Sequence, residues 1–164
     1  MAIRNIRLMG EPVLGKVSKE IKEVTPRLLE LIDDMFDTLY EAQGVGLAAP
    51  QVGILKRLFI IDIGEEESEP MVFINPTILE TSGEQTGYEG CLSVPDKSGK
   101  VTRPNYVKVK AYDEELNEFT LEGEGLLARA ILHEYDHLDG HLYVEKVEGP
   151  LVNNEDLMAE SEEE

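Results

Sequence analysis

The sequence has a single cysteine, Cys91, among its 164 residues. One thiol cannot form an internal disulfide, so covalent cross-links cannot stabilise this chain. A lone cysteine in a small enzyme serves as a metal-binding thiolate, as a nucleophile or as a small buried apolar residue. All three roles stay open at this point, and a reducing compartment is expected.

Long apolar runs are also missing. No stretch approaches the ~20 residues that span a bilayer, and residues 1–5 do not begin an apolar segment of the kind found in secretory signals. We therefore expect no secretion and no membrane partner, and a cytoplasmic location.

Basic residues are scarce: 15 Lys and Arg stand against 34 Asp and Glu, which gives a formal net charge of −19. Such a charge repels phosphate, so direct binding of nucleic acid is not expected. Much of it lies in residues 65–69 and 155–164, which favours a role in solvation. We predict one catalytic domain over residues 1–150 and an acidic tail over residues 151–164 that is ordered at most in part.

The apolar pattern predicts an α+β fold. Thr25-Pro26 is typical of a helix start, and apolar residues at three- and four-residue steps predict a helix that ends at Gly44. Runs at 57–62, 71–75 and 106–122 predict strands, the last of them an antiparallel hairpin. A second helix, from Leu126 to Gly140, is apolar nearly all round, which predicts antiparallel strands wrapped around a central buried helix.

Residues 133–137, His-Glu-Tyr-Asp-His, lie on that second helix. Positions four apart share one helix face, so His133 and His137 could bind one metal ion with Glu134 beside it. This is the arrangement of metal-assisted hydrolysis, although the motif fixes only three positions and also occurs by chance.

A catalytic centre of this kind needs a third protein ligand and an open position for water. The candidates are an acidic residue downstream, His141 and Cys91. His141 follows Gly140, where the helix should have ended, so we expect it in an exposed loop. Cys91 lies between Gly90 and Pro95 in a segment that predicts a tight loop, and such a loop suits a thiolate ligand.

Residues 44–53, Gly-Val-Gly-Leu-Ala-Ala-Pro-Gln-Val-Gly, are predicted to form a loop that a second chain could approach closely. Gln51 is the only side chain in it able to donate a hydrogen bond. The segment lacks the lysine and Ser/Thr of a phosphate-binding loop, which leaves a contact to a substrate backbone or a plain connection.

Taken together, residues 44–51, residues 89–93 (Glu-Gly-Cys-Leu-Ser) and residues 133–137 closely resemble the three motifs of peptide deformylase, in the family's order. The similarity extends from about residue 10 to about residue 149. It implies a metal-dependent hydrolase that removes the N-formyl group from the first methionine of newly made polypeptides and releases formate.

The resemblance implies a role for each motif. Cys91, His133 and His137 would bind the metal, and Glu134 would act as the general base. The Gln51 side-chain amide and the Leu92 backbone N–H would stabilise negative charge on the carbonyl oxygen. The family uses Fe²⁺, one ion per chain, although a Cys/His/His site also suits Zn²⁺, Ni²⁺ or Co²⁺.

The same resemblance implies where a formyl-methionyl peptide would bind. Its backbone would pair with the chain around Val45 and Gly46, as a strand added to an exposed edge. The remaining substrate contacts are expected from Glu89, Gly90, Leu126 and Ala130, with the methionine side chain in an apolar pocket near Val45, Leu126, Ala130 and His133. Arg103 is expected to pair with Glu89.

Some positions differ from those of relatives: Val45 is smaller than a frequent isoleucine, Gly87 replaces a larger apolar residue, and Arg129 stands where some members are apolar. Two other functions remain open, a zinc endopeptidase and a non-catalytic domain with a structural metal. The upstream cysteine argues against the first, and Glu134 beside the metal argues against the second.

Overall fold

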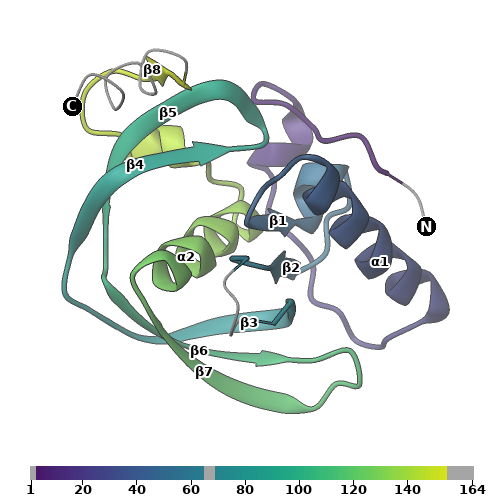
Figure 1. Ribbon diagram of the computed structural model, residues 1–164. Coiled ribbons are helices and arrows are strands. Elements are labelled where there is room, and N and C mark those ends of the chain that lie inside the picture. The colour runs from purple at the N-terminus through teal and green to yellow at the C-terminus, as the bar shows by residue number, and fades with distance from the viewer. Residues whose placement is uncertain (1–2, 65–68, 155–164) are drawn as a thin grey trace.

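The computed structural model describes residues 3–64 and 69–154. Two helices and eight strands, with three 3-10 turns, make up this part of the chain (Figure 1). The helices are α1 (Pro26–Glu41) and α2 (Leu126–Leu138). The strands are β1 (Gly46–Ala48), β2 (Leu58–Ile61), β3 (Met71–Ser82), β4 (Gln85–Cys91), β5 (Val94–Arg103), β6 (Tyr106–Tyr112), β7 (Glu118–Glu124) and β8 (Val152–Asn153). The 3-10 turns are η1 (Pro12–Gly15), η2 (Ala49–Val52) and η3 (Tyr143–Lys146).

The strands form two antiparallel sheets. One has the order β1-β2-β3-β6-β7 and the other β4-β5-β8, so β1 and β4 are both edge strands. The predicted α+β class with antiparallel strands is confirmed, as is the hairpin, which pairs β6 with β7. No helix within the described residues is long and apolar enough to cross a bilayer.

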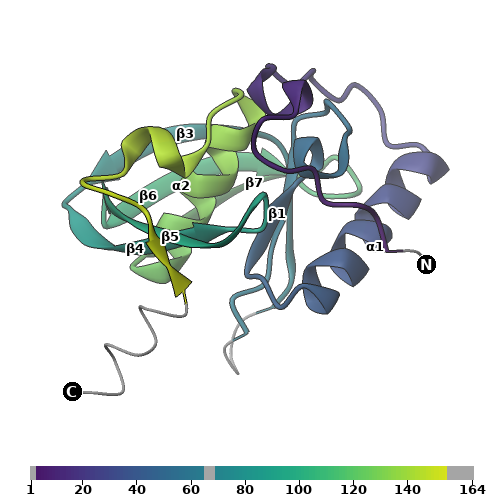
Figure 2. The same ribbon diagram turned by 90° about the horizontal axis from the view of Figure 1, so that it is seen from above.

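Strand β2 explains how the larger sheet is covered on both faces. Its four residues are all apolar and fully buried, as expected of a strand with no solvent-facing side. Leu58 and Ile60 pack in the cluster that contains the α1 residues, whereas Phe59 and Ile61 pack in the cluster that contains the α2 residues. Successive side chains of a strand point to opposite faces, so α1 and α2 cover opposite sides of this sheet (Figure 2).

Helix α1 begins as predicted, but its end differs. The Thr25 side chain accepts a hydrogen bond from the backbone N–H of Leu28 at 3.1 Å, and Pro26 is the first helical residue. The helix ends at Glu41, because Gln43, with φ of 57°, already has the left-handed conformation expected of the final glycine. Gly44 instead allows close packing, since a Cβ there would lie 3.0 Å from side-chain atoms of Leu39 and Leu92.

Two segments predicted as loops are more regular. Residues 44–53 contain β1 and η2, because Leu47, Ala48 and Ala49 are fully buried and β1 pairs with β2. Cys91 is the last residue of β4, and Pro95 lies within β5 and does not end the pairing. The register shifts between Gly90 and Cys91, so Pro95 falls in a bulge where no ladder N–H is needed.

The two acidic patches fall largely outside the described residues. Residues 65–68 and 155–164 are not described, and residues 151–154 provide β8, which pairs with β5 through Lys97 and Ser98. Helix α2 ends at Leu138 and is followed by Gly140 with φ of 83°, as predicted. His141 is exposed and contacts Glu145 at 3.2 Å, as expected for a loop residue.

Candidate metal centre and active site

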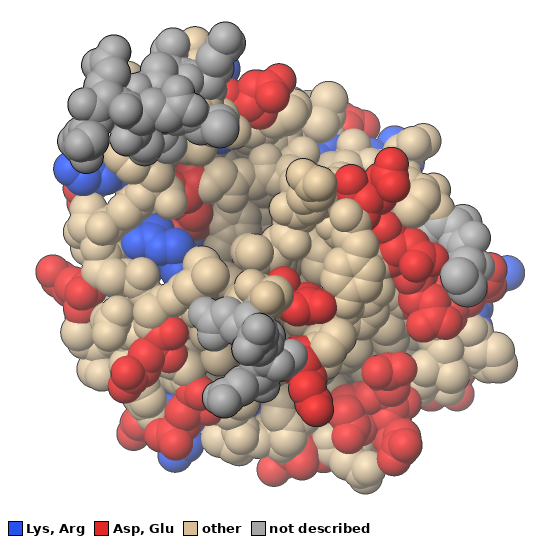
Figure 3. Space-filling model, in the orientation of Figure 1, with Lys and Arg blue, Asp and Glu red and all other residues tan. Residues whose placement is uncertain are grey.

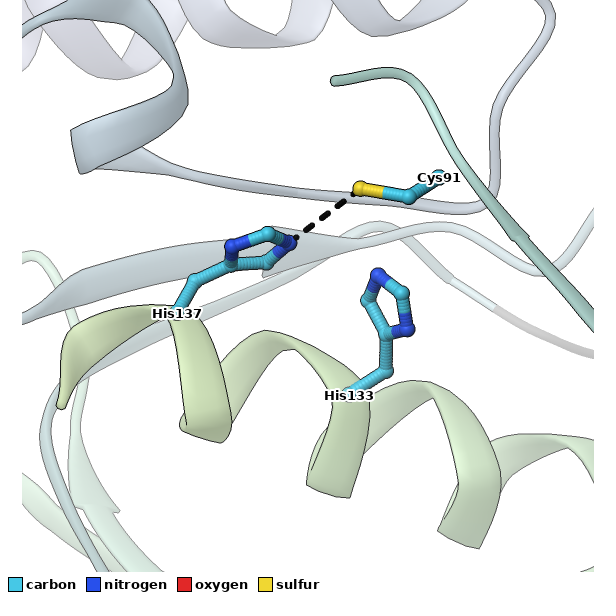
Figure 4. A group of neighbouring side chains, drawn as sticks. All are labelled: Cys91, His133 and His137. Carbon is cyan, nitrogen blue, oxygen red and sulfur yellow. Dashed lines mark hydrogen bonds between the residues drawn. The ribbon is translucent and has the colours of Figure 1, made fainter. Parts of the chain in front are cut away.

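The pentapeptide 133–137 lies in the last two turns of α2, and its two histidines face the end of β4. Cys91 Sγ lies 3.4 Å from Nε2 of His137, and the candidate ligand atoms of Cys91, His133 and His137 all lie within 4.8 Å of one another (Figure 4). Both histidines are buried, and their rings meet edge to face with centroids 5.0 Å apart. The described residues thus bring together two nitrogen donors and one sulfur donor from segments more than 40 positions apart.

The free ring atoms of these histidines fit a metal. Nδ1 of His133 contacts Oε1 of Glu89 at 2.5 Å, which leaves its Nε2 for coordination. Nδ1 of His137 is buried and has no hydrogen-bond partner among the described residues. Burial is the main cause that lowers the pKa of His137, and it favours the neutral imidazole that a ligand must be. Thiolate and imidazole donors together suit a divalent transition metal.

His133 is held by a buried ion-pair network that centres on Glu89. The Glu89 carboxylate accepts hydrogen bonds from Nη2 and Nε of Arg103, at 2.7 and 2.8 Å, and from Nη1 of Arg129 at 2.6 Å. Arg103 also pairs with Asp136, at 3.0 Å. The predicted pairing of Arg103 with Glu89 is confirmed. Burial alone would raise the pKa of Glu89, but the hydrogen bonds from His133 and Arg103 lower it well below its usual range.

Glu134 lies against the backbone of β1. A Cβ built on Gly46 would lie 2.7 Å from Oε2 of Glu134, so only glycine allows the carboxylate to approach this closely. Its other oxygen, Oε1, is buried and has no partner among the described residues. Burial is the main cause that raises the pKa of Glu134 from 4.5 to about 7. A carboxyl group with this pKa can both accept and release a proton near neutral pH.

Gln51 is oriented by its own backbone turn. Its Oε1 accepts a hydrogen bond from the backbone N–H of Ala48 at 2.9 Å, and Nε2 is directed toward Ser93 Oγ at 3.1 Å and Cys91 Sγ at 3.5 Å. The residue is 1% exposed. The amide donor is therefore fixed beside the three candidate metal ligands.

A cavity of about 450 Å³ opens beside these groups. Of the predicted site residues it is lined by Val45, Gly46, Gln51, Glu89, Gly90, Cys91, Leu92, Leu126, Ala130, His133 and Glu134. The remaining one, His137, is buried next to Cys91. Figure 3 shows mainly uncharged residues at the hollowed centre of this face and acidic residues around its margin.

Sequence reasoning missed two contacts of the site. Tyr143 is buried, and its ring stacks on His133 with centroids 6.0 Å apart. Ser93 is fully buried and accepts the hydrogen bond from Gln51. Ser93 stands within the Glu-Gly-Cys-Leu-Ser motif and could have been suspected there, whereas nothing in the local pattern around Tyr143 indicates a contact with His133.

Two imidazoles one turn apart, a cysteine sulfur and a buried carboxyl group beside a cavity are the functional groups of a metal-dependent hydrolase. The family model described as polypeptide deformylase matches residues 3–151. The chain belongs to this family of enzymes, which remove the N-formyl group from newly made polypeptides.

Individual peptide deformylases are similar to this chain over nearly its whole length. The peptide deformylase of Agathobacter rectalis is 67% identical over 151 residues, which cover 92% of this chain and 94% of the relative. That of Lachnoclostridium phytofermentans is 67% identical over 149 residues, or 91% of each chain. The crystal structure of a peptide deformylase from Legionella pneumophila is 42% identical and covers 98% of this chain and 92% of that one, with a TM-score of 0.87.

Proposed function

We propose that deformylation takes place in the cavity between β1 and β4, with Cys91, His133 and His137 as the ligands of one Fe²⁺ ion. The mutual approach of their ligand atoms to within 4.8 Å is the observation that carries the proposal. When bound, such an ion would acidify a water molecule and polarise the formyl oxygen. Zn²⁺, Ni²⁺ or Co²⁺ could take its place in a purified sample.

Glu134 is proposed as the general base and then as the general acid. It takes a proton from the attacking water, whose oxygen adds to the formyl carbon, and it later returns that proton to the leaving amine. The C–N bond breaks, and formate and a free amino terminus result. The open acceptor atom Oε1 and the pKa of about 7 support both roles.

Gln51 and Leu92 are proposed to stabilise the charge that develops on the formyl oxygen. The Gln51 amide cannot rotate freely, because its Oε1 already accepts the Ala48 N–H. A donor fixed in advance costs no reorganisation during the reaction, and the loss of one such donor typically lowers the rate ~100-fold or more.

The substrate backbone is proposed to lie between β1 and β4. Both are edge strands, and Val45, Gly46 and Gly90 border the cavity between them. The two oxygens of Glu89 are already bound by Arg103, Arg129 and His133, so its backbone is the part left for a contact with substrate. The methionine side chain would lie along α2, next to Leu126 and Ala130.

We further propose that residues 1–150 act as one catalytic domain in which α2 is the central buried helix. The burial of Ala128, Ile131 and Leu138 supports that position. A cytoplasmic location and a lack of direct contact with nucleic acid are proposed on the net charge of −19 and on the single free cysteine.

The test combines metal analysis with formate release. Protein purified without oxygen is expected to contain about one Fe²⁺ per chain and to release formate from formyl-Met-Ala-Ser. The Glu134→Gln variant is expected to keep its metal and to lose at least ~100-fold in kcat. An internal peptide bond, offered in parallel, should stay intact.

Three results would overturn the proposal. Cleavage of the internal bond without formate would identify an endopeptidase. Full activity of Glu134→Gln would exclude Glu134 as the base, and metal binding without any turnover by the wild-type protein would identify a structural site.

A further inference from the structure

The cavity wall on α2 contains an arginine. Leu126, Arg129, Ala130 and His133 all line the cavity, and their spacing places them on one face of the helix. Three of these four are the residues proposed to surround the first side chain of the substrate. The side chain of Arg129 is only 10% exposed. A guanidinium therefore forms part of the cavity wall, beside the apolar side chains of Leu126 and Ala130.

The inner face of β4 holds this guanidinium in place. Gln85, Gly87 and Glu89 alternate along the strand, so all three face the same side. Nε of Arg129 donates to Oε1 of Gln85 at 3.3 Å, and Nη1 donates to Oε2 of Glu89 at 2.6 Å. Nη2 donates to the backbone carbonyl of Val101 on β5, at 3.2 Å.

Gly87, which lies between Gln85 and Glu89 on β4, leaves space for the guanidinium. A Cβ at Gly87 would lie 3.6 Å from Nη2 of Arg129, in ordinary van der Waals contact. A side chain that extends beyond Cβ would take the volume that the guanidinium fills. The small residue at position 87 and the arginine at position 129 thus form a matched pair across β4 and α2.

The bound guanidinium still has donors to offer. A guanidinium carries five N–H groups, and the contacts to Gln85, Glu89 and Val101 need only one N–H from each nitrogen. Its charge is balanced by Glu89, so an acidic ligand would add a second carboxylate to the same site. A neutral hydrogen-bond acceptor is the chemistry that fits best, since it gains a charge-assisted bond without placing an unpaired charge in the cavity.

We propose that Arg129 is a specificity-determining residue that lets the side-chain pocket accept a first residue ending in a neutral hydrogen-bond acceptor. The oxidised form of the expected substrate, N-formyl-methionine sulfoxide, belongs to this class, because its S=O group replaces the thioether that would meet the same wall. This inference rests on the proposed function and adds a second substrate class to it.

The test measures kcat/KM for three peptides that differ only in the first residue: formyl-Met-Ala-Ser, formyl-Met-sulfoxide-Ala-Ser and formyl-norleucine-Ala-Ser. Norleucine has methionine's shape without its sulfur. The ratio of kcat/KM for the sulfoxide peptide to kcat/KM for the norleucine peptide therefore measures the effect of the hydrogen-bond acceptor. The Arg129→Leu variant is expected to lower this ratio about tenfold, mainly through KM, because it removes one hydrogen bond to a charged donor. Arg27→Leu, which removes an exposed arginine near the start of α1, should leave the ratio unchanged.

A second variant keeps the test decisive if Arg129→Leu does not fold. Gly87→Ile places a branched side chain in the volume of the guanidinium and should lower the same ratio without removing the charge. An unchanged ratio in either folded variant would overturn the inference. Failure of the wild-type protein to process any of the three peptides would instead refute the proposed function.

Discussion

Replacing Gly46 by alanine should separate two roles of β1. Gly46 borders the cavity where a peptide strand could pair, and it also allows Glu134 to approach the strand backbone. The two roles predict different kinetics, because the first affects substrate binding and the second affects the chemical step.

The structure gives the size of the displacement. An alanine Cβ would lie 2.7 Å from Oε2 of Glu134 and 3.0 Å from its Cγ, whereas ordinary contacts begin at 3.4 Å. The carboxylate must therefore move by about 0.7 Å at its tip, and the side chain, which is only 4% exposed, has little room to do so. A misplacement of about 1 Å in a catalytic group can cost ~100-fold in rate. We expect Gly46→Ala to lower kcat by about that factor and to change KM little.

The assay is formate release from formyl-Met-Ala-Ser, with metal content measured on the same sample. Gly15→Ala is the matched control, because a Cβ at Gly15 meets nothing within 4 Å. If Gly46→Ala keeps the wild-type kcat and raises only KM, then Gly46 acts through the substrate backbone, and the argument from Glu134 is wrong.

Three further predictions concern the Glu89 network, the metal ligand Cys91 and the proposed base Glu134. Arg103→Ala should lower the free energy of unfolding in urea by about 3–5 kcal/mol, because it leaves the buried Glu89 carboxylate without its bidentate partner. If the losses in free energy of unfolding caused by Arg103→Ala and Glu89→Ala simply add in the double variant, the pairing is contradicted. Cys91→Ala should lose bound metal, and added Fe²⁺ should no longer raise its melting temperature, whereas an undiminished rise would exclude the thiolate as a ligand. Because burial raises the pKa of Glu134 from 4.5 to about 7, its contribution to the stability of metal-stripped protein is full below pH 4.5 and is lost as the pH rises through 7. Between pH 4.5 and 8 the wild type should lose up to about 3 kcal/mol relative to Glu134→Gln, and parallel stability curves would refute this.

Local sequence patterns were enough to predict those features that depend on neighbouring residues alone. The start of α1 follows from Thr25-Pro26, and the β6–β7 hairpin follows from the alternation of Val107, Val109 and Ala111, all of which are fully buried. His133 and His137 could be paired from helix geometry alone. Cys91 was one candidate among three until the combined motifs pointed to a family.

Long-range contacts could not be predicted in the same way. The approach of Arg129 to β4 joins positions 40 apart or more, and no periodicity in either segment encodes it. The β4–β5 hairpin was missed because its glycines and Pro95 are typical of loops, and a bulge makes them compatible with pairing. The stacking of Tyr143 on His133 depends on how η3 folds back over the site.

Gly46 of β1 and Gly87 of β4 share one physical explanation. Glycine inside a strand weakens it, since it gains little from packing and loses more conformational entropy than other residues. Gly46 nevertheless begins β1, and Gly87 stands inside β4. Each lies where a functional side chain of α2 approaches the backbone, Glu134 in the first case and Arg129 in the second. At position 46 a Cβ alone would displace the Glu134 carboxyl group, whereas at position 87 only a side chain that extends beyond Cβ would displace the guanidinium. These two glycines therefore lie where the edge strands leave space for side chains of α2, the helix that carries Glu134 and the two histidines.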